Sequence, residues 1–222
     1  MLRLSHVRKI YIRNRIETLA LDDIDLSVAA GAFVAITGPS GCGKSTLLNV
    51  LGIMDAPTQG TCLLEGLDIY SHSERELVEL RNRSIGFIFQ SFNLLESPTV
   101  FENVELPLIY RKMDRKGRRA RVLEVLASLQ LQDYADFHPT DLSGGEQQRV
   151  AVARALVGAP KVVLADEPTG NLDSKSGETV MSLLETANRR GATIVMVTHS
   201  PTFAERAERV IEMLDGRIVG RE

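Results

Sequence analysis

Several features that define other classes of protein are absent from this sequence. Its 222 residues include only two cysteines, and Cys42 and Cys62 follow neither a disulfide framework nor a metal-ligand spacing. The formal net charge is −3, so the composition gives no general reason to expect nucleic-acid binding. The longest uncharged stretch, from Leu26 to Gly43, is broken by several glycines and Pro39 and does not suit a membrane span. These absences indicate a protein of a reducing compartment that does not itself cross a bilayer.

The first residues of the chain also lack the features of a secretory signal. Residues 1–5 alternate apolar with polar side chains, as a strand does, and contain no apolar core. We therefore expect a cytosolic chain. Its length suits one compact domain, with room for an inserted subdomain.

The stretch with the clearest chemistry is a glycine-rich loop that follows an apolar run, Phe33 to Ile36. The loop and the start of the next helix read Gly38-Pro39-Ser40-Gly41-Cys42-Gly43-Lys44-Ser45-Thr46. Its glycines let backbone N–H groups surround phosphate oxygens, and the helix start adds positive potential. Lys44 is then placed to reach the β- and γ-phosphates of a nucleotide, and Ser45 to ligate Mg²⁺. Alkylation of Cys42 in this loop is expected to block nucleotide binding, whereas Cys62 is interpreted as a small core residue.

The pattern around this loop mixes hairpins with a phosphate-binding strand and helix. Alternating apolar and polar residues predict antiparallel strands at 2–7 and 24–28, with Tyr11 in the tip between them. A further hairpin is predicted over 61–69, with its turn at Glu65-Gly66.

A second region begins after a short apolar strand, 85–90, that ends in a polar amide. From Ser91 to about Val157 the spacing of apolar residues is helical, which predicts an inserted helical subdomain. Residues 111–121 within it are strongly basic. Two interpretations stay open for them: a solvated helix face with its lead-in, or a basic collar near anionic headgroups or a partner.

The third region has the pattern of a parallel sheet. Continuous apolar runs at 162–165 and 193–198 predict strands buried on both faces, joined by a helix over 176–190. The last segment, 210–219, predicts a hairpin with an Asp-Gly turn.

Two carboxylates follow the buried strand that ends at Ala165. Asp166 comes at the carboxyl end of a predicted parallel strand, where it can hold Mg²⁺ with its water shell. Glu167 projects one residue further and is suited to polarise an attacking water molecule. Two other strand ends carry polar side chains: Gln90 could touch Mg²⁺, and His199 could reach a γ-phosphate.

A second candidate phosphate site lies at a predicted helix start, Leu142 to Arg149. Ser143 as N-cap and Glu146 three residues later form a capping box. The cap does not explain Gly144 and Gly145, which weaken a helix but let backbone amides approach a ligand closely.

Leu142 to Gln148 resembles the signature motif of the ATP-binding-cassette (ABC) ATPases, with Glu146 where glutamine is usual. The resemblance covers nearly the whole chain in the expected order. It implies Walker A at 38–46, the Q-loop at Gln90, Walker B at 162–166 with Glu167 as catalytic carboxylate, a D-loop ending at Asp173, the switch His199, and Tyr11 stacked on adenine. It also implies an α/β fold of the P-loop NTPase (RecA-like) kind: a mainly parallel sheet, an antiparallel β subdomain and an inserted α-helical subdomain. The core would comprise 1–90 and 158–222, and the helical subdomain 91–157.

The resemblance further implies how such a protein works. Two subunits would close head to tail around ATP and Mg²⁺, so that Ser143, Gly144, Gly145 and Glu146 of one subunit cap the nucleotide on the Lys44 loop of the other. The result is an ATP-dependent homodimer that opens after hydrolysis.

The stretch 91–107 resembles the part of ABC ATPases that docks on a separate transmembrane permease, which would hold this chain at the inner face of the membrane. Together with Ala165 to Asp173 it is similar to the ATPases of lipoprotein-releasing and macrolide-exporting systems. The alternatives are a regulatory ABC ATPase of the cell-division type, which signals without transport, and a soluble ABC protein of DNA repair or translation. The acidic net charge and the single cassette argue against the last.

Overall fold

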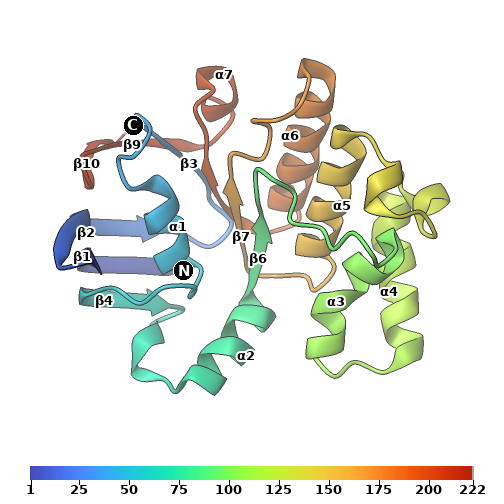
Figure 1. The fold of residues 1–222 in the computed structure, drawn as a ribbon, viewed down its shortest axis with the longest axis horizontal. Coiled ribbons are helices and arrows are strands. Elements are labelled where there is room, and N and C mark those ends of the chain that lie inside the picture. Colours follow the sequence, from blue (N-terminus) through green and yellow to red (C-terminus); the bar gives the residue numbers. More distant parts are fainter. Residues whose placement is uncertain (222) are drawn as a thin grey trace. The chain divides into compact units, whose positions relative to one another are not determined.

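The computed structural model describes residues 1–221, and the chain forms two compact units. The first unit comprises Met1–Arg81 together with the residues from Thr193 onward, and the second comprises Asn82–Ala192. Each unit has strands and helices of its own (Figure 1). The predicted helical subdomain, 91–157, falls within the second unit, and its boundaries stay a prediction.

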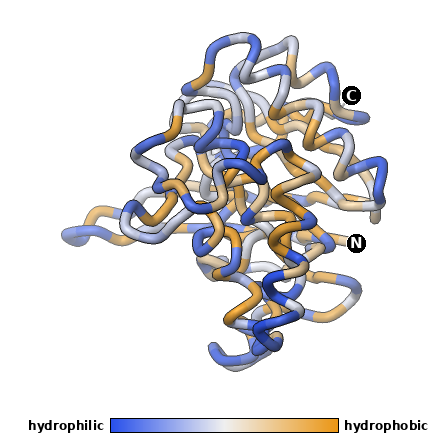
Figure 2. Tube along the Cα trace, turned by 90° about the vertical axis from the view of Figure 1, so that its right-hand side faces the viewer, coloured by the Kyte–Doolittle hydropathy of each residue, from blue (hydrophilic) through white to orange (hydrophobic). Residues whose placement is uncertain are grey.

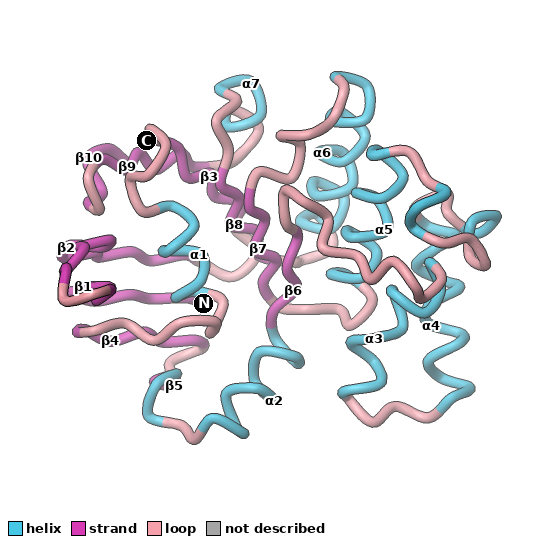
Figure 3. The backbone as a smooth tube through the Cα atoms, viewed as in Figure 1, coloured by secondary structure: helices cyan, strands magenta, loops and turns pink. Residues whose placement is uncertain are grey.

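The first unit contains both kinds of strand pairing that the sequence predicts. Its strands are coloured magenta in Figure 3. Its strands are β1 Leu2–Arg13, β2 Ile16–Val28, β3 Phe33–Thr37, β4 Gln59–Leu64, β5 Leu67–Asp68, β8 Thr193–Val197, β9 Arg209–Leu214 and β10 Arg217–Arg221. Its helices are α1 Lys44–Leu51, α7 Pro201–Ala204 and most of α2 Glu74–Ser84. One sheet has the order β2-β1-β4-β5 and is antiparallel. In the other, β3 lies parallel between β8 and β9, and β10 follows β9 as an antiparallel hairpin.

The hairpin of β1 and β2 is longer than the alternating pattern predicts. The prediction that Tyr11 lies at its tip is wrong, because Tyr11 lies within β1 and pairs with Thr18. Asn14 and Arg15 make the turn, and both are left-handed, with φ of 51° and 66°. Two left-handed residues match the twist of the flanking strands. An arginine in this conformation is uncommon and gives no turn signal in the sequence.

The other two hairpins turn where the sequence predicts. Glu65 and Gly66 join β4 to β5, with φ of 53° and 83°. Asp215 and Gly216 join β9 to β10, with φ of 46° and 78°. Glycine adopts the second left-handed position at no steric cost, so these turns are encoded locally.

Strands β3 and β8 form the buried centre of the first unit. Every residue of β8 and the first four of β3 are buried, as their continuous apolar runs predict. They pair in parallel register, with Ile36 opposite Val197. The loops that follow these two strands therefore begin at the same edge of the sheet.

The second unit joins a pair of parallel strands to four helices. The strands are β6 Ile85–Ile88 and β7 Val162–Asp166, and the helices are α3 Val100–Tyr110, α4 Arg115–Ser128, α5 Gly144–Leu156 and α6 Ser174–Arg189. The helical pattern was expected from Ser91 on, but the first helix begins only at Val100. A capping box of Thr99 and Glu102 fixes that start, and a loop precedes it.

The basic segment 111–121 is only in part a solvated helix face. Residues from Arg115 on belong to α4, as one of the two interpretations predicted. Arg111 instead donates hydrogen bonds to the main-chain carbonyl oxygens of Asn82, Arg83 and Gly158. Arg118 forms an ion pair with Glu105 over 2.8 Å. These two arginines therefore hold segments of the second unit together.

In the described part of the chain, no helix is both long and apolar enough to span a membrane. Polar residues interrupt the apolar ones along the trace (Figure 2).

Candidate nucleotide site

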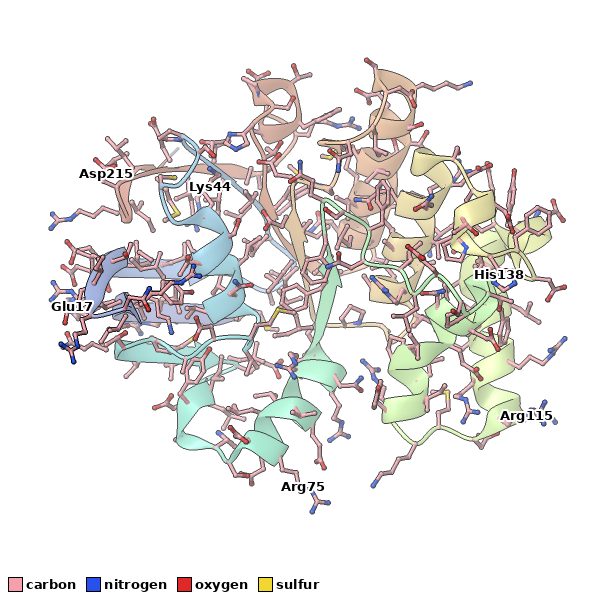
Figure 4. All side chains as sticks on the ribbon, viewed as in Figure 1. Glu17, Lys44, Arg75, Arg115, His138 and Asp215 are labelled. Atoms are coloured by element: carbon pink, nitrogen blue, oxygen red, sulfur yellow. The ribbon has the colours of Figure 1, made fainter. Side chains whose placement is uncertain are left out.

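The glycine-rich loop joins β3 to α1, in the order that the motif requires. Lys44 is the first residue of α1 (Figure 4), and only 6% of its surface is exposed. Its Nζ donates to the carbonyl oxygens of Gly38 and Pro39 over 2.9 and 2.8 Å. The Sγ atom of the buried Cys42 lies 3.8 Å from the same nitrogen. The loop thus surrounds the ammonium group, and a phosphate chain in the loop would meet this charge.

Two glycines of the loop are required by close contacts as well as by conformation. A Cβ atom on Gly38 would lie 2.2 Å from the carbonyl oxygen of Met213, and one on Gly43 would lie 2.4 Å from that of Ala20. Both have positive φ, 144° and 104°. Any side chain here would clash with the main chain, so the path of the loop depends on these two residues.

The start of α1 keeps its backbone N–H groups free of side-chain competition. Gly43 is the N-cap, and no side chain caps the helix. The first N–H groups of a helix lack partners within the helix and carry positive potential. Ser45 is exposed in this first turn. The arrangement fits an anion at the helix start and a hydroxyl ligand for its metal.

Tyr11 lies in a cluster that the sequence pattern did not reveal. Its hydroxyl donates to Oδ2 of Asp55 over 2.7 Å, and Lys9 Nζ contacts Oδ1 of the same carboxylate over 2.5 Å. Lys9 Nζ also lies 4.9 Å from the centre of the Tyr11 ring. Burial and the bond to Asp55 raise the pKa of Tyr11, although a hydrogen bond with Thr46 opposes them. Since Thr46 belongs to α1, Tyr11 lies beside the start of the phosphate-loop helix.

His199 follows the strand next to the phosphate loop. It comes two residues after Val197, which pairs with Ile36 of β3, and it is exposed. The N–H of Thr198 still donates to the carbonyl oxygen of Ile36 over 3.1 Å. The structure therefore brings His199 and the loop to one edge of the sheet, as expected from their positions after adjacent parallel strands.

In the second unit, the same logic applies to Gln90 and the two carboxylates. Ile88 pairs with Ala165 in the parallel ladder of β6 and β7, so Gln90, Asp166 and Glu167 all follow that pair at one edge. Gln90 is exposed, and Asp166 and Glu167 are half-buried. Glu167 is left-handed, with φ of 47°, which turns the chain sharply after the strand.

Ser143 and Glu146 form the predicted capping box at the start of α5. Oε2 of Glu146 accepts hydrogen bonds from both the N–H and the hydroxyl of Ser143, over 2.8 and 2.6 Å. These bonds, with a further one from Tyr134, lower the pKa of Glu146. The carboxylate is therefore charged at neutral pH and engages the Ser143 hydroxyl.

The two glycines of this motif differ in what surrounds them. A Cβ atom on Gly145 would lie 2.5 Å from Oγ of Ser176, so α5 and α6 approach each other closely only because this residue is glycine. A Cβ atom on Gly144 would meet nothing nearer than Cζ of Phe92, at 3.7 Å. Packing thus explains Gly145, and it leaves Gly144 without a packing reason.

Asp173 serves as the N-cap of α6 in this structure. Its carboxylate accepts from the N–H and the hydroxyl of Ser176, over 3.0 and 2.6 Å, and these bonds lower its pKa. Three further side chains bind main-chain carbonyl oxygens around Gln90, and the sequence does not predict these contacts: Gln148, Arg154 and Asn171.

The candidate residues fall into two groups, one in each unit. The first unit carries Tyr11, the loop from Gly38 to Thr46, and His199, and the second carries Gln90, Ser143 to Glu146, Asp166, Glu167 and Asp173. Their individual roles stay predictions.

Comparisons with known proteins agree with this pattern. A family model described as ABC transporter matches residues 21–170. The ABC transporter ATP-binding protein YvrO of Bacillus subtilis is 48% identical over 219 residues, which cover 99% of this chain and 96% of that protein. The macrolide export ATP-binding/permease protein MacB of Salmonella typhimurium is also 48% identical over 219 residues, but the chain spans only 34% of its length.

Solved structures show the same architecture along the chain. The ATP-binding cassette MJ0796, in a dimeric post-hydrolysis state bound to ADP and Pi, matches with a TM-score of 0.93 and 44% identity, over 100% of this chain and 98% of that one. CbiO1 of Clostridium perfringens, part of an ABC transporter complex, matches with a TM-score of 0.86 and 30% identity, over 99% of this chain and 87% of that one.

Proposed function

The chain belongs to the ATP-binding proteins of the ABC transporter family, and we propose that it hydrolyses ATP to drive a separate membrane subunit. The observation that carries this proposal is the buried Lys44 ammonium inside the glycine loop, at the start of an uncapped helix. Such an arrangement suits a phosphate chain, because the loop N–H groups, the helix start and the ammonium group all favour an anion.

The reaction converts ATP and water to ADP and phosphate. Lys44 and the N–H groups of the loop bind the β- and γ-phosphates and neutralise the charge that develops on them. Glu167 accepts a proton from the attacking water, and His199 hydrogen-bonds the γ-phosphate. Asp173 belongs to the D-loop of the nucleotide site, and Tyr11 contacts the adenine ring.

Mg²⁺ would be held by Ser45, Gln90 and Asp166. A hydroxyl, an amide oxygen and a carboxylate are hard oxygen donors, which suit this cation. Three such donors are too few to replace its whole water shell. When bound, the ion neutralises phosphate charge during the transfer.

The signature motif suggests a composite site in a two-fold dimer. In this proposal Ser143, Gly144, Gly145 and Glu146 of one subunit cap the ATP bound to Lys44 of the other. MJ0796, which is 44% identical, forms a dimer with ADP and Pi bound, and this supports the arrangement. ATP stabilises the closed dimer, and loss of the γ-phosphate lets it open.

The membrane partner is proposed to dock on residues 91–107. The side chain of Leu95 is 49% exposed in this stretch, on a loop that precedes α3, and offers apolar surface to another protein. MacB joins an ATP-binding part to a permease part in one chain, of which this chain spans about a third. A separate permease, of the kind used in lipoprotein release and macrolide export, would hold the protein at the cytoplasmic face of the membrane.

The proposal is tested by the mass of the Glu167→Gln variant in solution, with and without ATP. We expect a monomer without ATP and a dimer with ATP, because the amide cannot activate water and ATP persists between the subunits. ATP binding without a change of mass would contradict the composite site. Transport by a reconstituted complex with the permease would separate an exporter from a regulatory ATPase that only signals.

A further inference from the structure

Four main-chain carbonyl groups around Gln90 are held by side chains of α5 and of the turn after β7. Gln148 Nε2 donates to the oxygen of Phe89 over 3.4 Å, and Asn171 Nδ2 donates to that of Gln90 over 3.0 Å. Arg154 uses Nη2 and Nη1 to bind the oxygens of Phe92 and Asn93, over 2.9 and 2.6 Å. The segment 89–93 is therefore attached to α5 on both sides of Gln90.

Gln148 is the most confined of these side chains. It is fully buried, and its Nε2 also donates to the carbonyl oxygen of Pro168 over 2.6 Å. Two carbonyl oxygens face the amide, so the NH₂ group must point toward them. Its Oε1 is buried without a hydrogen-bond partner in the described structure. The unsatisfied oxygen costs stability, but an apolar side chain of similar size would take the donor from the carbonyl oxygens of Phe89 and Pro168. The amide is therefore held in place by what it binds on two separate segments.

Arg154 holds an unfavourable stretch of backbone. Phe92 and Asn93 are both left-handed, with φ of 59° and 49°. This conformation is unfavourable for phenylalanine, whereas asparagine tolerates it. The guanidinium is half-buried and makes two bonds in a fixed fork, one to each carbonyl oxygen. The ring of Phe92 in turn lies against Gly144 at the start of α5. The chain after Gln90 thus lies next to the signature motif.

We propose that Gln148 and Arg154 are positioning residues that couple the Gln90 segment to the signature helix α5. Gln148 ties the end of β6 to the turn that carries Pro168, directly after Glu167. Arg154 ties the chain after Gln90 to the same helix. Through these two residues, the segment 89–93 and the start of the docking stretch move together with α5 as one body. This inference rests on the proposed roles of Gln90 and Glu167.

The test compares Gln148→Met and Arg154→Lys with Arg111→Lys as matched control. Methionine fills a similar volume without donors, and lysine keeps the charge but loses the fork. Arg111 also binds main-chain carbonyl oxygens of the second unit, but those of Asn82, Arg83 and Gly158, outside the segment 89–93. The Arg111→Lys variant therefore measures how much kcat changes when an arginine that binds main-chain carbonyl oxygens elsewhere in the second unit is replaced.

Steady-state kinetics give the first readout. We expect kcat for ATP hydrolysis to fall about tenfold in Gln148→Met and Arg154→Lys, because a small displacement of catalytic groups has effects of this order. KM for ATP should stay close to wild type, since the carbonyl oxygens that the two side chains bind belong to Phe89, Phe92, Asn93 and Pro168 and not to the phosphate loop. Arg111→Lys should keep kcat near wild type whatever its melting temperature. An unchanged kcat in both test variants, or an equal loss in the control, would overturn the coupling.

Hydrogen exchange without nucleotide gives a second readout that does not depend on activity. The amides of residues 89–93 should exchange faster in both test variants than in wild type. In the control variant they should exchange at the wild-type rate. If the wild-type protein does not hydrolyse ATP, the proposed function is rejected. Hydrogen exchange at 89–93 would still show whether this segment is attached to α5. If Gln148→Met does not fold, Arg154→Lys decides alone. Unchanged exchange at 89–93 would reject the attachment itself.

Discussion

The hydroxyl of Ser143 donates a hydrogen bond to Oε2 of Glu146 over 2.6 Å. The N–H of Ser143 donates to the same oxygen, and Tyr134 adds a third bond to the carboxylate. The serine that is proposed to meet the γ-phosphate of the other subunit is thus engaged with an anion of its own helix. A phosphate that approached Ser143 would compete with Glu146 for this hydroxyl and be repelled by its charge.

Glu146→Gln should therefore strengthen the ATP-dependent dimer. Glutamine keeps the capping box and removes the negative charge. In the Glu167→Gln background, we expect the ATP concentration for half-maximal dimerisation to fall about fivefold, the effect of roughly 1 kcal/mol of relieved repulsion in a solvated site. Light scattering during an ATP titration measures this. Glu124→Gln, which makes the same charge change on α4, should leave the titration unaltered, and a weaker dimer in Glu146→Gln would contradict the argument.

The same hydrogen bonds predict how the stability of the cap depends on pH. They lower the pKa of Glu146 below the ordinary value of 4.5, with the Ser143 hydroxyl contributing most. A folded-state pKa below the unfolded one means that the stabilisation is complete above about pH 4.5 and is lost as pH falls through the folded value. The melting-temperature difference between wild type and Glu146→Gln should therefore shift against wild type as the pH falls below about 4.5 and the folded carboxylate takes up a proton. A difference independent of pH would show that the carboxylate gains nothing from its bonds.

Local signals in the sequence were sufficient for much of the fold. Glu65-Gly66 and Asp215-Gly216 contain the turn chemistry themselves, and the capping box at Ser143 needs only residues three positions apart. The turn at Asn14 and Arg15 was missed because arginine carries no preference for the left-handed conformation. Tyr11 was misplaced for that reason.

Contacts to the main chain were beyond sequence reasoning. Gln148 and Arg154 bind carbonyl oxygens up to 62 positions away, and every residue carries such an acceptor, so no residue type marks the partner. The Asp55 carboxylate that binds Tyr11 and Lys9 is likewise distant in sequence. Conversely, the phosphate loop and the strand-end residues stand out in the sequence because their proposed chemistry restricts the residue type at each position, and their roles stay predictions.

The two glycines of the signature motif should respond differently to alanine. Gly145→Ala would place a Cβ 2.5 Å from Oγ of Ser176 and 2.9 Å from its Cβ, so α5 and α6 must separate. We expect a loss of about 1–3 kcal/mol in the free energy of unfolding, the usual cost of overpacking. Gly144→Ala meets Phe92 only at 3.7 Å and gains helix propensity, so its stability should equal or exceed wild type. Urea unfolding measures both, and equal losses would contradict the packing explanation.

Lys44→Ala tests the centre of the nucleotide site. The substitution removes the only group in the loop that brings a full positive charge to the phosphates, and its loss should lower kcat/KM for ATP hydrolysis by about 10²-fold or more. The effect on folding should be smaller, although Lys44 Nζ also donates hydrogen bonds to the carbonyl oxygens of Gly38 and Pro39 and helps hold the loop. Hydrolysis and nucleotide binding are therefore measured beside the melting temperature. Lys116→Ala, an exposed lysine in the first turn of α4, is the matched control for loss of one positive charge. Wild-type turnover in Lys44→Ala would show that the phosphates bind elsewhere, whereas loss of turnover with a native melting curve would place the chemistry at this loop.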